Sequence, residues 1–271
     1  MTSMQLWTFA SGSSGNCFLL ESEGTRLLIE CGRAYSTMLE YLDGCHVAAE
    51  SVSGILLTHA HGDHARSAPA LAEAFRIPIY ASRGTLGCLD LEDRTLGRPI
   101  EADQPFRLGE VEVRPFAVPH DCHEPLGYRF ESATGQVCLT TDLGWVPDSA
   151  VRQFKDVDLL VIESNYDPGL LANGPYPTFL KRRVAGSRGH LSNAAAAAAI
   201  AACGERAPGM VWLAHLSEQN NTPGHALATI RGTLKRRGLA HVALKTTRHR
   251  RPSLYWDSAS SVRREKQLAL F

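Results

Sequence analysis

The 271-residue sequence has no surplus of charge, because 28 Lys and Arg side chains balance 28 Asp and Glu side chains. Bulk electrostatics therefore select no acidic or basic partner. The sequence also lacks an apolar run long enough to cross a bilayer, and no basic region followed by a long apolar stretch opens it. We therefore expect a cytoplasmic protein without a membrane partner.

Paired cysteines are lacking as well. The seven cysteines are odd in number and include no Cys-x-x-Cys pair, which argues against a disulfide framework and predicts a reducing compartment. No internal repeat is visible. The 44% hydrophobic share is ordinary for a soluble globular protein, and a chain of this length can bury a full core.

Basic residues are unevenly distributed along this neutral chain. One cluster comprises Lys181, Arg182, Arg183 and Arg188. A larger group crowds the C-terminal part and comprises Lys235, Arg236, Arg237, Lys245, Arg248, Arg250, Arg251, Arg263, Arg264 and Lys266. Such clusters either contact phosphates or form an ordinary solvated surface, and the sequence alone leaves both interpretations open.

Short apolar segments separated by turns predict strands interspersed with helices. Residues 6–9, 17–20 and 27–29 are separated by Ser-Gly and Glu-Gly turns, which favours an antiparallel meander. Further strands are predicted at 55–57, 77–80, 111–118, 128–130, 137–140, 159–162, 211–214 and 242–244. Helices are predicted at 65–75, from Ser192 or Asn193 to 202, and from Thr222-Pro223 to the Lys235–Gly238 segment.

This pattern predicts an α+β fold in which two sheets face each other and helices lie outside. We assign residues 1–256 to one domain. The composition turns polar and Ser-rich after Trp256, so we interpret residues 257–266 as a flexible tail.

The most informative segment follows the predicted strand at 55–57 and contains His59, His61, Asp63 and His64. Imidazole nitrogen and carboxylate oxygen are ligands for zinc and similar divalent ions. In an extended segment His59 and His61 point to the same side, whereas Asp63 and His64 open the next element and can face a second ion. The spacing favours a two-metal site over a surface loop rich in histidine.

Three more metal-capable residues directly follow predicted strands. They are His120, Asp142 and His215. Loops that follow strands converge at one edge of a sheet, so we expect these side chains to complete the site.

Together these motifs resemble the metallo-β-lactamase-fold hydrolases, and within them the YycJ/WalJ-like proteins, which are regarded as DNA-directed exonucleases. The motifs that carry the resemblance are Ser11–Asn16, the cluster at 58–64, His120-Asp121, Thr140–Gly144, Glu163–Asn165, Tyr176-Pro177, Gly189–Asn193, His215–Ser217 and Asn220-Asn221. The resemblance implies an αββα sandwich. This chain departs from the branch at two positions. It has Glu30 where the branch usually carries aspartate, and Tyr166 where the branch usually carries histidine. Tyr166 cannot replace a neutral imidazole as a ligand.

The resemblance also implies two ligand sets that share Asp142 as a bridge. The first set is His59, His61, His120 and Asp142, and the second is Asp63, His64, Asp142 and His215. Two Zn²⁺ or Mn²⁺ ions about 3.5–4 Å apart suit in-line hydrolysis of a phosphodiester, with Asp63 orienting the attacking hydroxide. The expected activity is that of a 5′ to 3′ DNA exonuclease in replication-linked repair.

The segment around His190 allows two interpretations. It lies just before a predicted helix N-terminus, where it could contact the substrate phosphate or protonate the leaving oxygen, or it could be a buried structural histidine. Ser192 fits a helix cap better than a catalytic group. The Ser11–Asn16 loop could cradle a phosphate or form a plain hairpin turn.

The chain ends in Gln267-Leu268-Ala269-Leu270-Phe271, which is similar to the short peptides that bind the bacterial sliding clamp. Gln267 offers an amide for hydrogen bonding, whereas Leu268, Leu270 and Phe271 are apolar anchors. A strand or helix end docked on the body of the protein is the alternative interpretation.

Two other functions compete with the nuclease. One is a hydrolase of a small thioester, lactone or cyclic phosphodiester on the same fold. The other is a non-catalytic adaptor that binds DNA and the clamp. A structural zinc needs only four ligands, so the larger ligand complement disfavours the adaptor.

Overall fold

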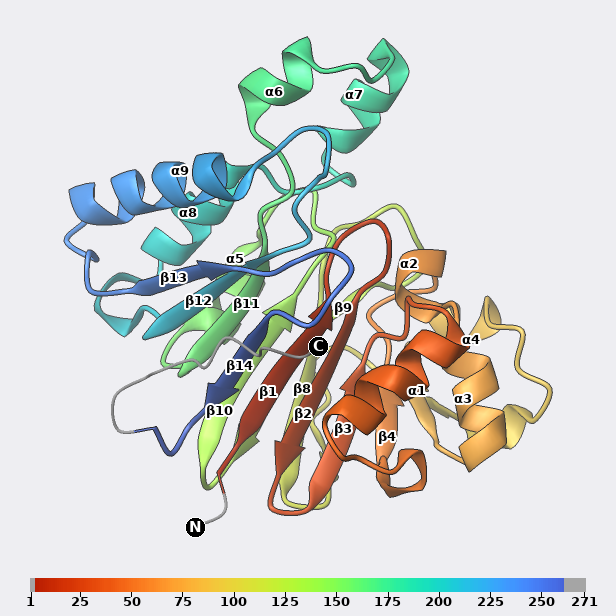
Figure 1. Cartoon of the computed structure of the whole chain (residues 1–271). Coiled ribbons are helices and arrows are strands. Elements are labelled where there is room, and N and C mark those ends of the chain that lie inside the picture. The colour runs from red at the N-terminus through yellow and green to blue at the C-terminus, as the bar shows by residue number, and fades with distance from the viewer. Residues whose placement is uncertain (1–2, 261–271) are drawn as a thin grey trace.

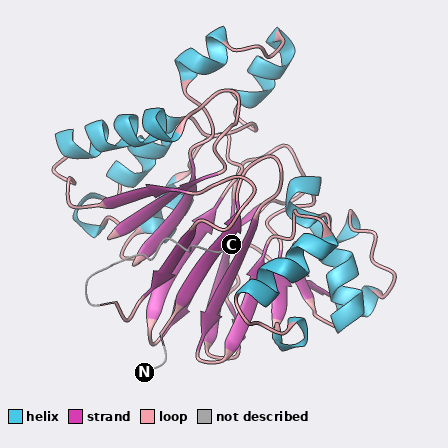
Figure 2. Ribbon diagram, viewed as in Figure 1, coloured by secondary structure: helices cyan, strands magenta, loops and turns pink. Residues whose placement is uncertain are grey.

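The computed structural model describes residues 3–260, which form two seven-stranded sheets that face each other (Figures 1 and 2). The first sheet contains, in spatial order, β14 (Leu254–Asp257), β1 (Gln5–Ala10), β2 (Cys17–Ser22), β3 (Thr25–Ile29), β4 (Gly54–Leu56), β5 (Ile79–Ala81) and β6 (Gly97–Pro99). The second contains β13 (Ala243–Thr246), β12 (Met210–Ala214), β11 (Leu159–Glu163), β10 (Gly135–Thr140), β9 (Leu126–Ser132), β8 (Val111–Ala117) and β7 (Phe106–Leu108).

Each sheet is antiparallel in one half and parallel in the other. The predicted meander of β1, β2 and β3 is antiparallel, and β4, β5 and β6 continue the sheet in parallel. In the second sheet β10 to β13 are parallel, whereas β7, β8 and β9 pair antiparallel. The carboxyl ends of parallel strands meet at one edge of a sheet, and this edge carries the site described below.

Helices cover the outer faces of both sheets (Figure 2). The α-helices are α1 (Tyr35–Gly44), α2 (Gly62–Ala65), α3 (Ala68–Phe75), α4 (Arg83–Gly87), α5 (Asp148–Phe154), α6 (Pro168–Asn173), α7 (Thr178–Val184), α8 (Asn193–Ala201) and α9 (Pro223–Arg236). Three short 3₁₀ helices are η1 (Ala49–Ser51), η2 (Arg94–Leu96) and η3 (Gly204–Arg206).

Three layers of apolar side chains hold these elements together. The layer between the sheets includes Trp212 and Tyr128, both fully buried. Helices α1 and α3 bury Met38 and Leu71 against the first sheet, while Ile230 of α9 lies in the layer on the second sheet. These layers confirm the predicted αββα sandwich.

One predicted helix is interrupted. Residues 65–75 were expected to form a single helix, but α2 ends at Ala65 and α3 begins at Ala68. Pro69 lies in the first turn of α3, where its ring is tolerated; in a helix continuing from α2 the ring would clash with the carbonyl of Ala65. The break lets Ser67 donate a hydrogen bond to the carbonyl of Cys31 at 3.0 Å.

The last described residues belong to the first sheet. Strand β14 runs to Asp257, and Ser258 exchanges hydrogen bonds with the backbone of Met4, so the start of the segment predicted as a tail is ordered. The clamp-like peptide at 267–271 lies outside the described residues. Within 3–260 no helix has the length and apolar character needed to cross a bilayer. All seven cysteines are free.

Candidate metal centre

Sharp bends at strand ends direct side chains into the site. Glu30 follows β3, Asp142 lies just beyond β10 and His215 follows β12, with φ values of 63°, 59° and 52°. A non-glycine residue in this left-handed region costs on the order of 1–3 kcal/mol and persists only where its surroundings enforce it. Three such residues at one edge of the sandwich mark this edge as functional.

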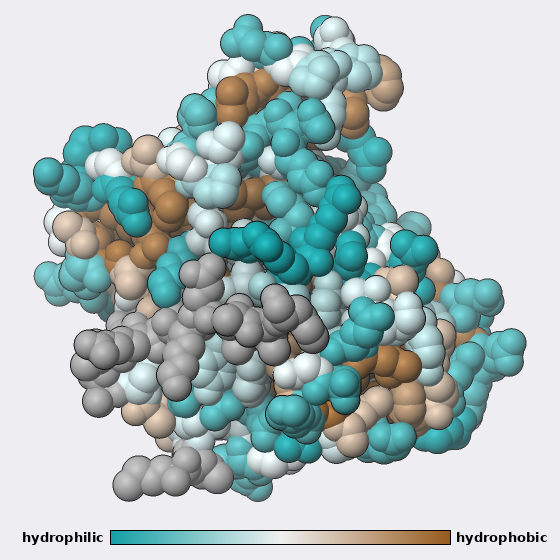
Figure 3. Space-filling model, viewed as in Figure 1, coloured by the Kyte–Doolittle hydropathy of each residue, from teal (hydrophilic) through white to brown (hydrophobic). Residues whose placement is uncertain are grey.

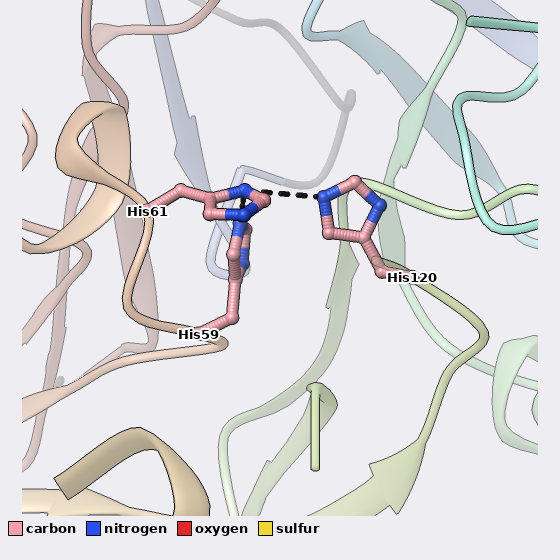
Figure 4. A group of neighbouring side chains, drawn as sticks. All are labelled: His59, His61 and His120. Carbon is pink, nitrogen blue, oxygen red and sulfur yellow. Dashed lines mark hydrogen bonds between the residues drawn. The ribbon is translucent and has the colours of Figure 1, made fainter. Parts of the chain in front are cut away.

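His59, His61 and His120 bring three ring nitrogens together (Figure 4). The Nδ1 of His61 lies 3.0 Å from Nε2 of His59 and 3.3 Å from Nε2 of His120. Two nitrogens bound tetrahedrally to one zinc at about 2.0–2.1 Å would be roughly 3.4 Å apart. Nδ1 of His120 donates a hydrogen bond to the carbonyl of Gly189 at 3.0 Å, which leaves its Nε2 lone pair free for an ion.

Asp63, His64 and His215 form the second group. One carboxylate oxygen of Asp63 lies 3.5 Å from Nε2 of His64 and 3.5 Å from Nε2 of His215. Asp142 lies between the two groups, with its Oδ2 2.9 Å from Nε2 of His64 and its Oδ1 4.0 Å from Nε2 of His120. All seven predicted ligands therefore converge, with Asp142 in the bridging position.

The contacts of the buried ligand atoms show that this donor set fits cations. Within the described residues, Oδ2 of Asp142 and Nε2 of His215 are buried and contact other candidate ligands, Nε2 of His64 at 2.9 Å and Oδ2 of Asp63 at 3.5 Å. Buried imidazoles and carboxylates that converge in this way are paired with one another or bind a metal ion, because a buried unpaired charge is costly. Bound divalent ions would satisfy both atoms, and the set of imidazoles and carboxylates suits Zn²⁺ or Mn²⁺.

Glu163 is a functional residue to which the sequence analysis gave no role, although its motif carried part of the resemblance. It ends β11 and is fully buried. Its Oε1 lies 2.8 Å from Nδ1 of His190 and 2.9 Å from Nδ1 of His215, and its Oε2 accepts the backbone N–H groups of Leu143 and Leu191. Both oxygens are engaged in hydrogen bonds, which suits a carboxylate that orients the histidines; its Oε1 also lies close enough to Asp142, His190 and His215 to share a cation with them. In the sequence, its position at the end of a predicted strand was the feature that could have indicated this role.

Glu30, the departure from the branch pattern, contacts the ligand His64. Its Oε1 lies 3.3 Å from Nδ1 of His64 and accepts the backbone N–H of Thr58 at 3.2 Å. Gly32 brings this strand end close to the metal-binding segment, because a Cβ there would lie 1.8 Å from the carbonyl oxygen of Asp63. The longer side chain of glutamate is thus accommodated with its carboxylate beside a ligand.

Burial and opposite charges shift the pKa values of the site in opposing directions. Burial penalises the charged forms of His64 and His215, but Asp142 and the other carboxylates outweigh it. The pKa of His64 is raised well above its ordinary value, and that of His215 is raised to about 9. In Asp142 and Asp63 burial is likewise outweighed by the histidines, and the pKa of each carboxyl is lowered. Burial dominates at His59, whose pKa is lowered, so this imidazole is neutral.

His190 lines a cavity of about 380 Å³ together with five of the predicted ligands, which are His61, Asp63, His120, Asp142 and His215. Its Nδ1 lies 2.8 Å from Glu163 and 3.2 Å from Oδ1 of Asp142. Burial opposes protonation, but Glu163 and Asp142 raise the pKa of His190 well above its ordinary value. A protonated imidazole that faces a cavity can bind an anion or donate a proton.

The other predicted polar residues have mixed positions. Ser192 caps α8 by accepting the N–H of Ala195 at 3.1 Å, as expected of a helix cap. Tyr166 forms an isolated bridge with Ser192 and does not line the cavity, so the departure at this position leaves the described ligand cluster intact.

The Ser11–Asn16 loop connects β1 and β2 and reaches the site. Ser11 accepts the backbone N–H of His215 at 2.9 Å, and the side-chain amide of Asn16 lies 3.1 Å from Nε2 of His64. Ser13 lines the cavity. The loop is therefore a hairpin connection that also fixes two of the ligands.

Comparison with known proteins agrees with this geometry. A model described as a beta-lactamase superfamily domain matches residues 25–216. The exodeoxyribonuclease YycJ of Bacillus anthracis is 32% identical over 237 residues, which cover 84% of this chain and 88% of the relative. The exodeoxyribonuclease WalJ of Streptococcus pneumoniae is 33% identical over 222 residues, which cover 78% of this chain and 81% of the relative.

A solved structure supports the fold. The metallo-beta-lactamase fold protein YhfI from Bacillus subtilis superimposes with a TM-score of 0.71 at 19% identity, covering 94% of this chain and 100% of that chain. The fold and the resemblance predicted from the motifs are thereby confirmed. The chain belongs to the beta-lactamase superfamily, in the branch that contains YycJ and WalJ.

Proposed function

We propose that this protein is a binuclear, metal-dependent DNA exonuclease that degrades DNA from 5′ to 3′ in replication-linked repair in the cytoplasm. The observation that carries the proposal is the convergence of the seven predicted ligands beside a cavity that five of them and His190 line, in a chain that is 32–33% identical to proteins named exodeoxyribonucleases. The basic residues Arg183 and Arg188 near this cavity suit a polyanionic substrate.

Two divalent ions, Zn²⁺ or Mn²⁺, would lower the pKa of water and neutralise charge that develops on the phosphodiester. The ligand histidines, Asp63 and Asp142 would hold these ions, and Asp63 would also orient the attacking water through a hydrogen bond. His190 contacts the phosphate and donates its proton to the leaving oxygen as the P–O bond breaks. Glu163 holds His190 in place at 2.8 Å.

The experiment is degradation of 5′-labelled and 3′-labelled oligonucleotides by the purified protein with zinc or manganese. We expect early release of the 5′ label and gradual shortening of the 3′-labelled strand. Asp63→Ala should abolish both, because it removes a ligand and the group that orients water. Full activity in this variant would contradict the assignment.

Parallel assays on other substrates, and a test of the cellular role, separate the competing functions. A metal-loaded protein that leaves DNA intact but cleaves a thioester, lactone or cyclic phosphodiester would be a small-molecule hydrolase. An adaptor would cleave none of these and would keep its cellular role with the Asp63→Ala substitution.

The proposal includes a tether to the sliding clamp through Gln267, Leu268, Leu270 and Phe271. The support is sequence similarity alone, since these residues lie outside the described part of the chain. Tethering raises the local concentration of DNA and would let a protein of zero net charge act on it. Deletion of residues 267–271 should abolish capture by the clamp in a pull-down and leave cleavage of free oligonucleotides unchanged. Unchanged capture would exclude the tether.

A further inference from the structure

A helical excursion stands apart from both sheets (Figure 1), and its residues Leu180, Arg183 and Val184 line the cavity of the candidate site. It comprises α6 and α7 and the loops around them, residues 168–189. This segment contains four basic residues, Lys181, Arg182, Arg183 and Arg188, and no acidic one, although the whole chain is neutral. Figure 3 shows apolar side chains exposed among hydrophilic ones over α6 and α7. An excursion of this composition attracts anions to the cavity entrance.

The two faces of α7 differ in character. Leu180 and Val184 line the cavity. Phe179 is followed at helical spacing by Arg182 and Arg183, so Arg183 lies between the cavity-lining residues and the exposed Phe179. Phe179 is 73% exposed, more than the other large hydrophobic residues exposed in the described chain, Trp145 and Tyr35. A single exposed apolar side chain is ordinary, but this one is three and four residues from two exposed arginines, of which Arg183 lines the cavity and pairs with Asp121 at 2.8 Å.

Arg183 connects this exposed face with the ligand cluster. It lines the cavity, and its Nε donates a hydrogen bond to Asp121 at 2.8 Å. Asp121 in turn lies 3.3 Å from Nε2 of the ligand His120. A phosphate entering beside Arg183 would therefore lie next to the group of ligands.

The excursion is held firmly at its roots. Asp167 caps α6 by accepting the N–H groups of Gly169 and Leu170, and Lys181 donates a hydrogen bond to the carbonyl of Ala172, which joins α7 to α6. The carbonyl of Val184, at the end of α7, accepts the N–H of His190 at 2.8 Å. Because α7 is attached to His190, a strand bound on α7 would have a fixed position relative to the reacting groups.

We propose that α7 binds the substrate strand. Phe179 stacks on an unpaired base of the entering DNA, while Arg182 and Arg183 bind its phosphates. This inference rests on the proposed nuclease function and adds the form of the substrate. Bases inside a duplex are already stacked on both faces, so a lone aromatic ring gains most from an unpaired strand. A cavity of about 380 Å³ is at the small end of the range for drug-sized ligands and matches a strand end better than a duplex.

Binding is measured by fluorescence anisotropy with the metal-loaded protein and a phosphorothioate-linked single strand, which resists hydrolysis. Phe179→Ala should weaken binding by about 5- to 100-fold, since base–aromatic stacking contributes about 1–3 kcal/mol per base. Phe179→Trp should bind as well as the unchanged protein. Tyr35→Ala, which removes an exposed aromatic side chain from α1, is the matched control and should have no effect.

Probes that lack one base at successive positions locate the stacked base. At that position Phe179→Ala should cause no further loss, whereas at the other positions its effect should persist. Arg182→Ala and Arg183→Ala should each reduce the slope of log affinity against log salt by about one, whereas Arg236→Ala at the end of α9 should not change it.

Several results would overturn the inference: unchanged affinity of Phe179→Ala, equal losses on all probes, or a blunt duplex bound as tightly as the single strand. A fall in molecular mass of Phe179→Ala by light scattering would assign the face to self-association. These binding results do not depend on cleavage. If the protein binds the strand through Phe179 but does not cut unmodified DNA, the nuclease proposal fails, whereas the proposed binding of the strand by α7 is supported.

Discussion

At the scale of single residues, the site depends on buried carboxylates that act by contacting the ligand histidines. Glu163 and Glu30 each face a histidine nitrogen and also accept backbone N–H groups. An unpaired buried carboxylate would be costly, so these groups hold the imidazoles and the strand ends in one arrangement. The ordering of the site therefore begins before any cation binds.

The ligands were predictable from their types and positions, because His and Asp after apolar strands have few structural uses. Glu163 was harder to interpret, since a glutamate at the end of a strand is as common on a surface as in a site. Its role depends on contacts with His190 and His215, which lie 27 and 52 residues further along the chain. Local spacing carries no information about such contacts.

Substitution of His190 tests its chemical role. His190→Gln keeps a hydrogen-bonding side chain beside Glu163 but removes the transferable proton, so kcat should fall by about 100-fold or more. Metal content measured by elemental analysis should stay unchanged. His241→Gln, at an exposed histidine, is the control and should retain full activity. Loss of metal from His190→Gln would show that this residue is a ligand.

At the scale of elements, apolar strands such as β11 and β12 were readily predicted because every residue in them is buried in the layered fold. Helices α6 and α7 were not predicted from the sequence. They are short and largely exposed, so they lack the apolar periodicity of a helix packed along its length. Hydrogen bonds such as that from Lys181 to Ala172 stabilise them, and these depend on tertiary structure.

The cap of α8 gives a prediction at this scale. Ser192→Ala should lower stability by about 1 kcal/mol and the melting temperature by roughly 2–4 °C, because the N–H of Ala195 loses its acceptor. The kcat should not change. Thr222→Ala removes the corresponding cap of α9 and should produce a similar loss. A fall in turnover with an unchanged melting temperature would instead assign Ser192 to the chemistry.

At the scale of the whole molecule, the two sheets contribute ligands to one shared edge. His59, His61 and His64 follow β4 of the first sheet, whereas Asp142 and His215 follow strands of the second. The inter-sheet core that buries Trp212 therefore fixes the distance between the two halves of the site. The two-layer class was predictable from the strand pattern, but the strand order that brings these ends together was not, because the pairing of distant strands leaves no local pattern in the sequence.

Metal binding should consequently couple to both folding and pH. In the metal-free protein the raised pKa values of His64 and His215 stabilise the fold below about pH 6.5, and this contribution is lost as pH rises, for His215 through about 9. The lowered pKa values of Asp63 and Asp142 stabilise the fold above pH 3.8, the ordinary pKa of an aspartate. This contribution is lost as pH falls from there through the lowered pKa values. The metal-free protein should therefore become less stable from pH 6.5 to 9.

The metal-loaded protein should lose this pH dependence over the same range, because its ligand histidines are neutral in both the folded and the unfolded state. Ions bind neutral imidazole and must displace a proton from each charged histidine. For each proton displaced, metal affinity rises about tenfold per pH unit, and the rise due to His215 continues up to about pH 9. Thermal unfolding at pH 6, 7.5 and 9, with manganese or after chelation, should give a difference in melting temperature that grows with pH. Asp142→Ala, which removes the bridging ligand, should show little difference at any of these pH values. A difference that is constant or shrinks with pH in the unchanged protein would mean that protonated histidines do not compete with the ions at this edge.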